Sequence, residues 1–161
     1  MSFEDLVREH AAALFRYAFW LARDRHQAED VVQEALLRGW RAFPRLRERA
    51  AAKAWLYSIV RNEHLRAVGR KPPPAESLEE SDLPDQRDAS AGLEMREALM
   101  ALPPSYAEPL ALQVLGGFSC AEIASMLDTT EGATMTRLTR ARQALRRMVA
   151  PGAGKSAGGR A

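Results

Sequence analysis

The residues best suited to contact a charged polymer lie between Thr130 and Met148, where five arginines alternate with hydroxyl and apolar side chains. Apolar or small residues recur there at spacings of three and four, which predicts a helix that buries one stripe. The predicted stripe consists of Thr134, Leu138, Ala141, Leu145 and Met148. The other sides carry Gly132, Thr136, Thr139, Arg140, Gln143 and Arg147, with Arg137, Arg142 and Arg146 at the flanks. Threonine and arginine side chains reach base edges and phosphates when a helix enters the major groove, so this helix is a candidate for duplex recognition.

A second helix is predicted directly before this basic helix. The run Ser119-Cys120-Ala121-Glu122 fits a capping box, in which the serine hydroxyl and the glutamate carboxylate each accept from the other residue's amide. Asp128-Thr129-Thr130 then interrupts the apolar pattern with side chains that cap a new helix. A turn of about three residues between two helices predicts a helix-turn-helix. This context favours DNA recognition over the alternative, a charged helix face exposed to solvent.

Another group of polar side chains lies in the predicted helix 27–43. Asp30, Gln33 and Glu34 fall within about one turn and form a polar edge beside the apolar side of that helix. The predicted apolar side consists of Val31, Ala35, Leu36, Gly39, Trp40 and Phe43. Taken alone, the polar edge is more typical of an ordinary exposed acidic face than of a partner surface.

The whole chain is predicted to be all-α, with two small helical domains joined by an acidic, flexible linker. Helical periodicity predicts further helices over 3–21, 51–68, 93–102 and 106–115, and no segment alternates with the period of two that a strand requires. The predicted organisation is a first domain over 1–71, a linker over 72–92, a helix-turn-helix domain over 93–149 and a disordered tail over 150–161.

The linker prediction depends on proline and charge. Three consecutive prolines at 72–74 cannot continue a helix, and the segment after them is polar, acidic and aperiodic. The net charge is +5 over residues 1–71, −6 over 72–100 and +3 over 101–161. Two basic lobes therefore flank an acidic connector.

Several classes of site are excluded by residue types. Cys120 is the only cysteine, and His10, His26 and His64 share no metal-ligand spacing with it or with one another, so we expect no metal, no cofactor and no enzyme activity. Cys120 is expected to pack as a small apolar side chain. No run of about 18 apolar residues is present and the first residues are acidic, so we expect a cytoplasmic protein without membrane insertion of its own.

Two sets of motifs, in a fixed order, resemble the extracytoplasmic-function (ECF) group of bacterial sigma factors, within the sigma-70 family. The first set is Asp30-Val31-Val32-Gln33-Glu34 followed by Trp55-Leu56-Tyr57-Ser58-Ile59-Val60-Arg61-Asn62. The second set is Leu102-Pro103, Gly117-Phe118-Ser119, Glu122-Ile123-Ala124 and Arg137-Leu138-Thr139-Arg140-Ala141-Arg142. Each short piece occurs widely, whereas their order and spacing together are specific. The resemblance covers about residues 3–148.

The resemblance implies a subunit that binds core RNA polymerase and directs it to promoter DNA, with an anti-sigma factor as a further partner. By matching positions it implies polymerase binding through Asp30, Val31, Gln33 and Glu34. For the upstream (−35) promoter element it implies contacts from Met135, Thr136, Arg137, Thr139, Arg140 and Arg142. For the downstream (−10) element it implies Arg45, Arg47, Arg49, Lys53, Trp55 and Asn62, a basic and aromatic group of the kind that captures single-stranded bases. Trp55 is expected to support that group from the core rather than to capture a base itself.

Three positions depart from the family pattern in the helix-turn-helix. Asp128 stands where a turn glycine is usual, Thr129 stands where an aliphatic residue is usual, and Thr134 replaces a buried valine. A buried threonine hydroxyl must find a hydrogen bond within its own helix.

Two other functions stay open on sequence alone. One is a free-standing helix-turn-helix regulator that binds duplex DNA without polymerase and dimerises through its first lobe. The other is a polymerase-binding inhibitor that lacks promoter recognition. The first would bind a duplex tightly by itself, whereas a sigma factor of this size is expected to need polymerase.

Overall fold

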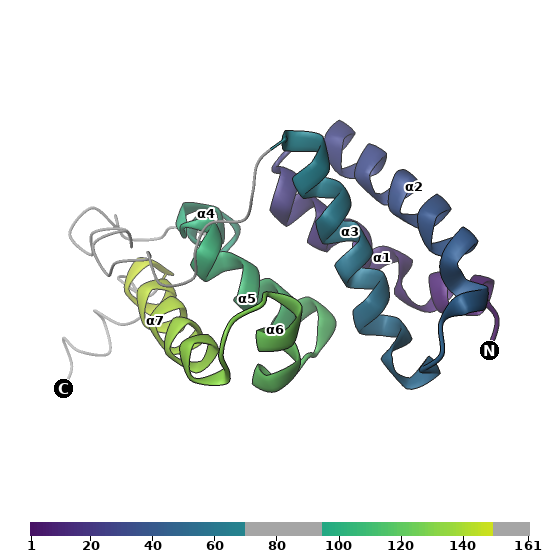
Figure 1. Ribbon diagram of the computed structural model, residues 1–161. Helices are drawn as coiled ribbons and strands as arrows, with labels where there is room; N and C mark the ends of the chain where they lie inside the picture. The colour runs from purple at the N-terminus through teal and green to yellow at the C-terminus, as the bar shows by residue number, and fades with distance from the viewer. Residues whose placement is uncertain (70–94, 150–161) are drawn as a thin grey trace. The chain divides into compact units, whose positions relative to one another are not determined.

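The computed structural model describes residues 1–69 and 95–149, and in these residues the chain is helical with no strand. Its helices are α1 (Phe3–Ala22), α2 (Arg25–Ala42), α3 (Ala52–Val68), α4 (Met95–Ala101), α5 (Pro104–Gly116), α6 (Cys120–Met126) and α7 (Glu131–Val149), with two 3-10 turns, η1 (Phe43–Arg45) and η2 (Arg49–Ala51) (Figure 1). The all-α prediction is confirmed. The predicted linker over 72–92 and the tail over 150–161 lie outside the described residues.

The chain divides into two compact units, each with its own buried side chains. The first unit contains α1, α2, α3 and the segment Ala111–Glu122, and the second contains α4, α7 and the remaining parts of α5 and α6. The predicted domain boundaries near residues 71 and 93 fall among residues that the structure does not describe, so these boundaries stay predictions.

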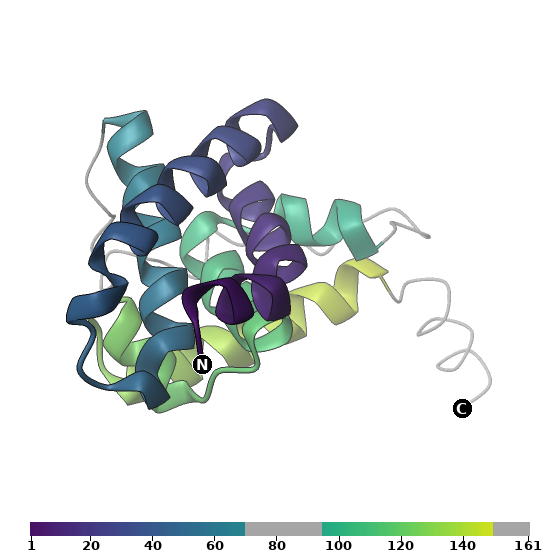
Figure 2. The same ribbon diagram turned by 90° about the vertical axis from the view of Figure 1, so that its right-hand side faces the viewer.

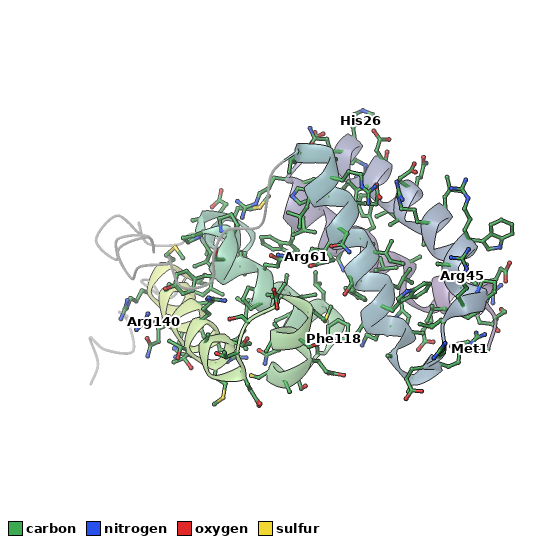
Figure 3. The ribbon with its side chains drawn as sticks, in the orientation of Figure 1. Met1, His26, Arg45, Arg61, Phe118 and Arg140 are labelled. Atoms are coloured by element: carbon green, nitrogen blue, oxygen red, sulfur yellow. The ribbon has the colours of Figure 1, made fainter. Side chains whose placement is uncertain are left out.

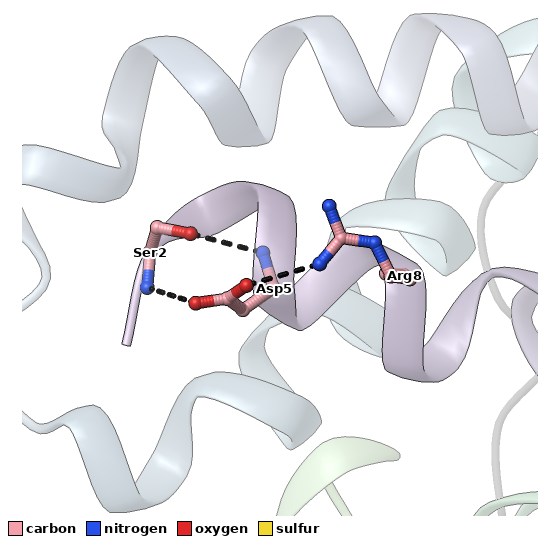
Figure 4. A network of polar contacts seen from close by, with 3 residues as sticks. All are labelled: Ser2, Asp5 and Arg8. Atoms are coloured by element: carbon pink, nitrogen blue, oxygen red, sulfur yellow. Dashed lines mark hydrogen bonds and ion pairs between the residues drawn. The ribbon is translucent and has the colours of Figure 1, made fainter.

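Helix α1 begins with a complete capping box. The Ser2 hydroxyl accepts a hydrogen bond from the Asp5 amide at 3.0 Å, and the Asp5 carboxylate accepts from the Ser2 amide at 3.3 Å (Figure 4). Arg8 pairs with the same carboxylate at 3.1 Å. These hydrogen bonds, first of all the one from the Ser2 backbone, hold the pKa of Asp5 below its usual value. The amides at the start of α1 thus gain partners that the helix itself cannot supply.

Helices α1, α2 and α3 pack on one another, and Figures 1 and 2 show them side by side. Helix α2 turns a narrow stripe to its neighbours, made of Ala28, Val31, Ala35 and Gly39. Because three of these four residues are alanine or glycine, the backbone of α2 can lie close to α1 and α3. Large side chains from the neighbouring helices, Leu14 and Tyr17 of α1 and Leu56 of α3, are fully buried in this unit.

The aromatic residues of this unit form pairs across its helices. The Tyr17 and Tyr57 rings lie 5.4 Å apart between centroids, as do those of Phe3 and Phe43, and both pairs are tilted. Burial raises the pKa of the Tyr57 hydroxyl. These pairs fix α1 against α3 and against the segment that follows α2.

Helix α5 begins two residues earlier than the predicted start at Tyr106. Pro104 occupies its first position, where the missing amide donor costs no helical hydrogen bond. The preceding helix α4 ends at Ala101, before the Pro103-Pro104 pair that is expected to stop it. Pro109 lies inside α5.

We predict that Gly39→Ala destabilises the first unit by about 1–3 kcal/mol, the range for overpacking a filled site. A Cβ atom at Gly39 would lie 3.2 Å from two ring atoms of Phe3 and 3.5 Å from Leu56 Cδ1. The Phe3 ring is itself held by Phe43, so it cannot yield freely. Thermal unfolding followed by tryptophan fluorescence measures this effect, because the three tryptophans are Trp20, Trp40 and Trp55, all in α1–α3.

Gly132→Ala is the matched control, since Gly132 is also helical but a Cβ atom added there would meet no other atom within 4 Å. This substitution is expected to raise the stability of α7 by about 0.5 kcal/mol through helix propensity. Equal unfolding temperatures for Gly39→Ala and the unsubstituted chain would contradict the tight packing of α2.

Candidate nucleic-acid and protein interfaces

The predicted capping box at the start of α6 is present. The Glu122 amide donates to the Ser119 hydroxyl at 3.1 Å, and the Ser119 amide donates to the Glu122 carboxylate at 2.8 Å. Ile123 and Ala124 are buried on the inner side of this short helix. Cys120 is partly buried in its first turn, as expected for a packing thiol.

The turn between α6 and α7 has the two hydrogen bonds of a Schellman motif. The Thr129 amide donates to the Ala124 carbonyl at 2.9 Å, and the Asp128 amide lies 3.4 Å from the Ser125 carbonyl. Asp128 is in the left-handed region, with φ of 56°. This conformation explains why glycine is the usual residue at such a position, and why aspartate, which tolerates it better than most residues, can replace it. The Thr130 hydroxyl then accepts from the Ala133 amide at 3.0 Å and caps α7.

We predict that Asp128→Val destabilises the second unit by about 1–2 kcal/mol, because a β-branched residue is strained at this φ. Asp128→Gly relieves the strain and is expected to keep or raise stability. The comparison of the two variants by thermal unfolding, followed by circular dichroism, isolates the backbone effect from the loss of the carboxylate. Two variants of equal stability would show that the turn does not require the left-handed conformation.

Helix α7 buries a wider arc than the predicted stripe. Its buried residues are Thr134, Arg137, Leu138, Ala141, Ala144, Leu145 and Met148. The Thr134 hydroxyl donates to the Thr130 carbonyl at 3.0 Å, so the predicted hydrogen bond within the same helix is confirmed. The five predicted stripe residues are all in the arc, and Arg137 and Ala144 extend it to one side.

The opposite side of α7 forms an open face, which we call the α7 open face. Its exposed residues are Met135, Thr136, Thr139, Arg142, Gln143, Arg146 and Arg147. Arg140 is half-buried at its edge and projects from the outer side of α7 in Figure 3. The structure thus places five of the six residues predicted for the upstream element on or beside one surface. This surface combines hydroxyl, apolar and guanidinium groups, as a helix in a major groove requires.

Arg137 is the exception among these six residues. Its exposed fraction is only 8%, and it interacts with other groups of the chain. Arg137 and Ala144 are seven residues apart, which places them on the same side of the helix, and that side is buried. The structure therefore places Arg137 within the buried arc rather than at its flank, and its contact with DNA stays a prediction.

A second open face lies on α2. Asp30, Gln33 and Glu34 are exposed, as predicted for a partner surface. Val31 is predicted to join them, but its exposed fraction is 5% because it belongs to the stripe that packs on α1 and α3. Val31 thus lies beneath the face rather than on it, and its contact with polymerase stays a prediction.

Two apolar residues of this face are absent from the predicted partner surface. Leu37 and Trp40 are 49% and 59% exposed, whereas Trp40 is predicted on the apolar, inward side of its helix. Both follow Gln33 at helical spacing, so Gln33, Leu37 and Trp40 form one outward row. We call Asp30, Gln33, Glu34, Leu37 and Trp40 the α2 open face. The spacing from Gln33 is the signal that could have identified Leu37 and Trp40.

A groove of about 720 Å³ runs beside this row between α1 and α2. Its lining residues are Phe3, Glu4, Val7, Arg8, Gln33, Leu36, Leu37 and Trp40. An exposed tryptophan next to an apolar groove is typical of a protein-binding surface, because tryptophan contributes strongly to interfaces.

The segment between α2 and α3 presents the predicted basic residues. Arg45, Arg47 and Arg49 are all exposed, and Figure 3 labels Arg45 there. The Arg49 guanidinium lies 4.1 Å from the centre of the Phe43 ring, which is a cation–π contact. The 3-10 turns η1 and η2 thus hold a short basic surface directly before α3.

The remaining residues predicted for the downstream element lie on helix α3, where the Lys53 ammonium donates to the Gly116 carbonyl. Asn62 is exposed, whereas Lys53 and Trp55 are half-buried. The Trp55 ring lies 6.1 Å from that of Phe43, so it packs under the basic segment. This position agrees with the expectation that Trp55 supports the group.

The described residues offer no cluster of His, Cys, Asp and Glu side chains that could hold a metal ion. None of the helices in this part of the chain is long and apolar enough to cross a membrane.

Comparison with known proteins agrees with this arrangement. The models of "Sigma-70 region 2" and "Sigma-70, region 4" match residues 6–71 and 92–145. The ECF RNA polymerase sigma factor SigL of Mycobacterium tuberculosis is 37% identical over 88% of this chain and 85% of its own length. SigM of the same species is 33% identical over 92% of this chain and 77% of its own length.

A solved structure gives the same result for the fold. The sigma factor RpoE of Bartonella quintana, crystallised in complex with the anti-sigma factor NepR, is 25% identical, with a TM-score of 0.69 over 91% of this chain and 95% of the other. The chain belongs to the sigma-70 family of RNA polymerase sigma factors, in the ECF group. Sigma factors of this family are transcription initiation factors.

Proposed function

We propose that this chain binds core RNA polymerase in the cytoplasm through the α2 open face and directs it to promoters through the α7 open face and the basic segment before α3. The observation that carries the proposal is the presence of separate exposed surfaces of different chemistry. One is acidic and apolar, and the other two are rich in arginine. An acidic and apolar face suits a protein partner, whereas arginine-rich faces suit nucleic acid.

The α7 open face is proposed to read the upstream promoter element. Met135, Thr136 and Thr139 stand near the N-terminal half of α7, which is the part of a recognition helix that meets base edges. Arg140 is close enough to this group to reach a base, and Arg142 is better placed for a phosphate.

The basic segment is proposed to bind DNA at the downstream element. Arg45, Arg47 and Arg49 supply positive charge, and Lys53 and Asn62 add donors along α3. A basic groove with aromatic support is the usual means of holding an unpaired strand. Opening of the promoter would supply that strand.

An anti-sigma factor is the proposed third partner. The matching Bartonella structure contains an anti-sigma factor, and an inhibitor of this chain would need to cover surfaces that polymerase or DNA uses. The α2 open face is exposed in the described chain and is available to either protein.

The test of the proposed function is run-off transcription over genomic fragments with purified core polymerase. Specific transcripts that require this chain are expected. A gel shift with and without core enzyme separates the proposal from a free-standing regulator, which would retard a duplex tightly by itself. Tight duplex binding without polymerase, together with no specific transcript, would contradict the proposal.

We predict that Trp40→Ala weakens binding to core polymerase by at least about tenfold, as expected when an exposed tryptophan anchor of an interface is truncated. Met135→Ala is the matched control, because Met135 is 53% exposed on α7 and is proposed to contact DNA only. Its affinity for core enzyme is expected to stay unchanged. Fluorescence titration of the labelled chain with core polymerase measures both, and unchanged affinity of Trp40→Ala would remove this residue from the interface.

We predict that Arg140→Ala and Arg142→Ala have different effects on promoter recognition. Arg140→Ala should cost about 1–3 kcal/mol and relax the preference at one position of the upstream element, because it removes a base contact. Arg142→Ala should weaken binding almost equally for all sequences and reduce its salt dependence, because it removes a phosphate contact. Binding of the variant holoenzymes to a set of single-base promoter variants distinguishes them. A uniform loss for Arg140→Ala would make it a phosphate contact as well.

A further inference from the structure

Glu63 is the one acidic side chain that is buried among the residues the structure describes. It lies on α3, where it continues the inward row of Ala52, Leu56 and Val60 at helical spacing. A position that would ordinarily hold an apolar residue therefore holds a carboxylate. A buried carboxylate is strongly unfavourable unless a cation and hydrogen bonds compensate for the lost hydration.

The compensating cation comes from the neighbouring helix. Arg38 of α2 forms an ion pair with the Glu63 carboxylate through its Nε atom, and Arg66 Nε lies 3.5 Å from the same oxygen. Arg38 is also near a second carboxylate on its own helix, since its Nε atom lies 4.0 Å from Glu34 Oε2. The four side chains form a row of alternating charge: Glu34, Arg38, Glu63 and Arg66.

Glu34 and Glu63 therefore compete for one guanidinium. Glu63 holds it at the closer contact, in an environment that is more strongly shielded from water: the side chain of Glu63 is 8% exposed and that of Glu34 is 49% exposed. Charge pairs are stronger where water is excluded. Without the Glu63 charge, Arg38 would have Glu34 as its nearest carboxylate partner, at the favourable spacing of i and i+4.

We propose that Glu63 is a positioning residue for polymerase binding: it holds Arg38 against α3 and thereby keeps the guanidinium from a closer contact with Glu34, so that the Glu34 carboxylate of the α2 open face can meet a cationic group of the polymerase. The inference rests on the proposed function, because it requires Glu34 to contact core enzyme. Glu63 itself is buried beneath that surface and touches no partner.

The substitution Glu63→Gln tests this role, because the amide keeps the size of the side chain and one oxygen acceptor for Arg38 but removes the charge. Affinity of the full chain for core polymerase is expected to fall about two- to fivefold, the range of an exposed ion pair that is lost at an interface. Glu34→Gln is expected to give a loss of the same size. The double variant Glu34→Gln/Glu63→Gln is expected to lose no more than either single variant, since both act through one charge.

A second double variant distinguishes the positioning role of Glu63 from a purely structural role. In Arg38→Gln/Glu63→Gln the guanidinium of Arg38 can no longer neutralise Glu34. Affinity is therefore expected to return to within about twofold of that of the unsubstituted chain, a smaller loss than the one expected for Glu63→Gln alone. Thermal unfolding of each variant is measured in parallel. If Glu63 only stabilises the fold, the loss and the recovery of affinity will be accompanied by matching changes in unfolding temperature, because removal of both partners of a buried pair can also restore the fold. Affinity that falls and recovers without such changes supports the positioning role.

The outcomes distinguish the inference from the proposed function. Failure of the unsubstituted chain to bind core polymerase would overturn both. With that binding intact, the inference alone is overturned by a Glu63→Gln variant of unchanged affinity, by a silent Glu34→Gln variant, by additive losses in Glu34→Gln/Glu63→Gln, or by no recovery in Arg38→Gln/Glu63→Gln.

Discussion

The close approach of α2 to its neighbours is the constraint on which the first unit depends. The stripe of Ala28, Val31, Ala35 and Gly39 turns no large α2 side chain toward the neighbouring helices, and a methyl group at Gly39 would already crowd the Phe3 ring. Because the stripe occupies so little of the helix surface, the larger residues of α2 must lie elsewhere on it. Leu37 and Trp40 are therefore exposed beside Asp30 and Glu34, and packing of the core and exposure of the partner surface have the same cause.

Helix α7 differs from α2 in how it combines a buried side with an exposed one. Its buried arc is wide enough to include a threonine and an arginine, and Thr134 satisfies its hydroxyl on the preceding turn of its own helix. The turn before it is fixed by a Schellman motif with Asp128 in the left-handed region and by the Thr130 cap. These local contacts set where α7 starts, and hence which residues of its first turns, Met135 and Thr136 among them, are exposed.

Helical periodicity was sufficient to predict every described α-helix within a few residues, because caps, prolines and apolar spacing are local properties of the sequence. Periodicity was not sufficient where the burial of a residue depends on which other helices pack against its own helix. Val31 and Trp40 are both apolar residues of α2, so hydropathy alone does not show which of them faces α1 and α3, and only the spacing of Trp40 from the polar Gln33 separates the two. The helical angle of 100° per residue predicts Arg137 at the flank of the stripe, whereas the structure buries it. The ion pair of Arg38 with Glu63 joins two helices, and the sequence of neither helix alone predicts it.

The exposed acidic residues of α2 show why such long-range pairs affect function. A glutamate four residues before an arginine on a helix ordinarily pairs with it, and this pairing would reduce the negative charge that a partner meets. In this chain the arginine is shared with a buried carboxylate of α3, and the surface glutamate lies at the longer distance of 4.0 Å. The charge presented by one helix is thus set by a residue of the next, which links the interior of the unit to the chemistry of its surface.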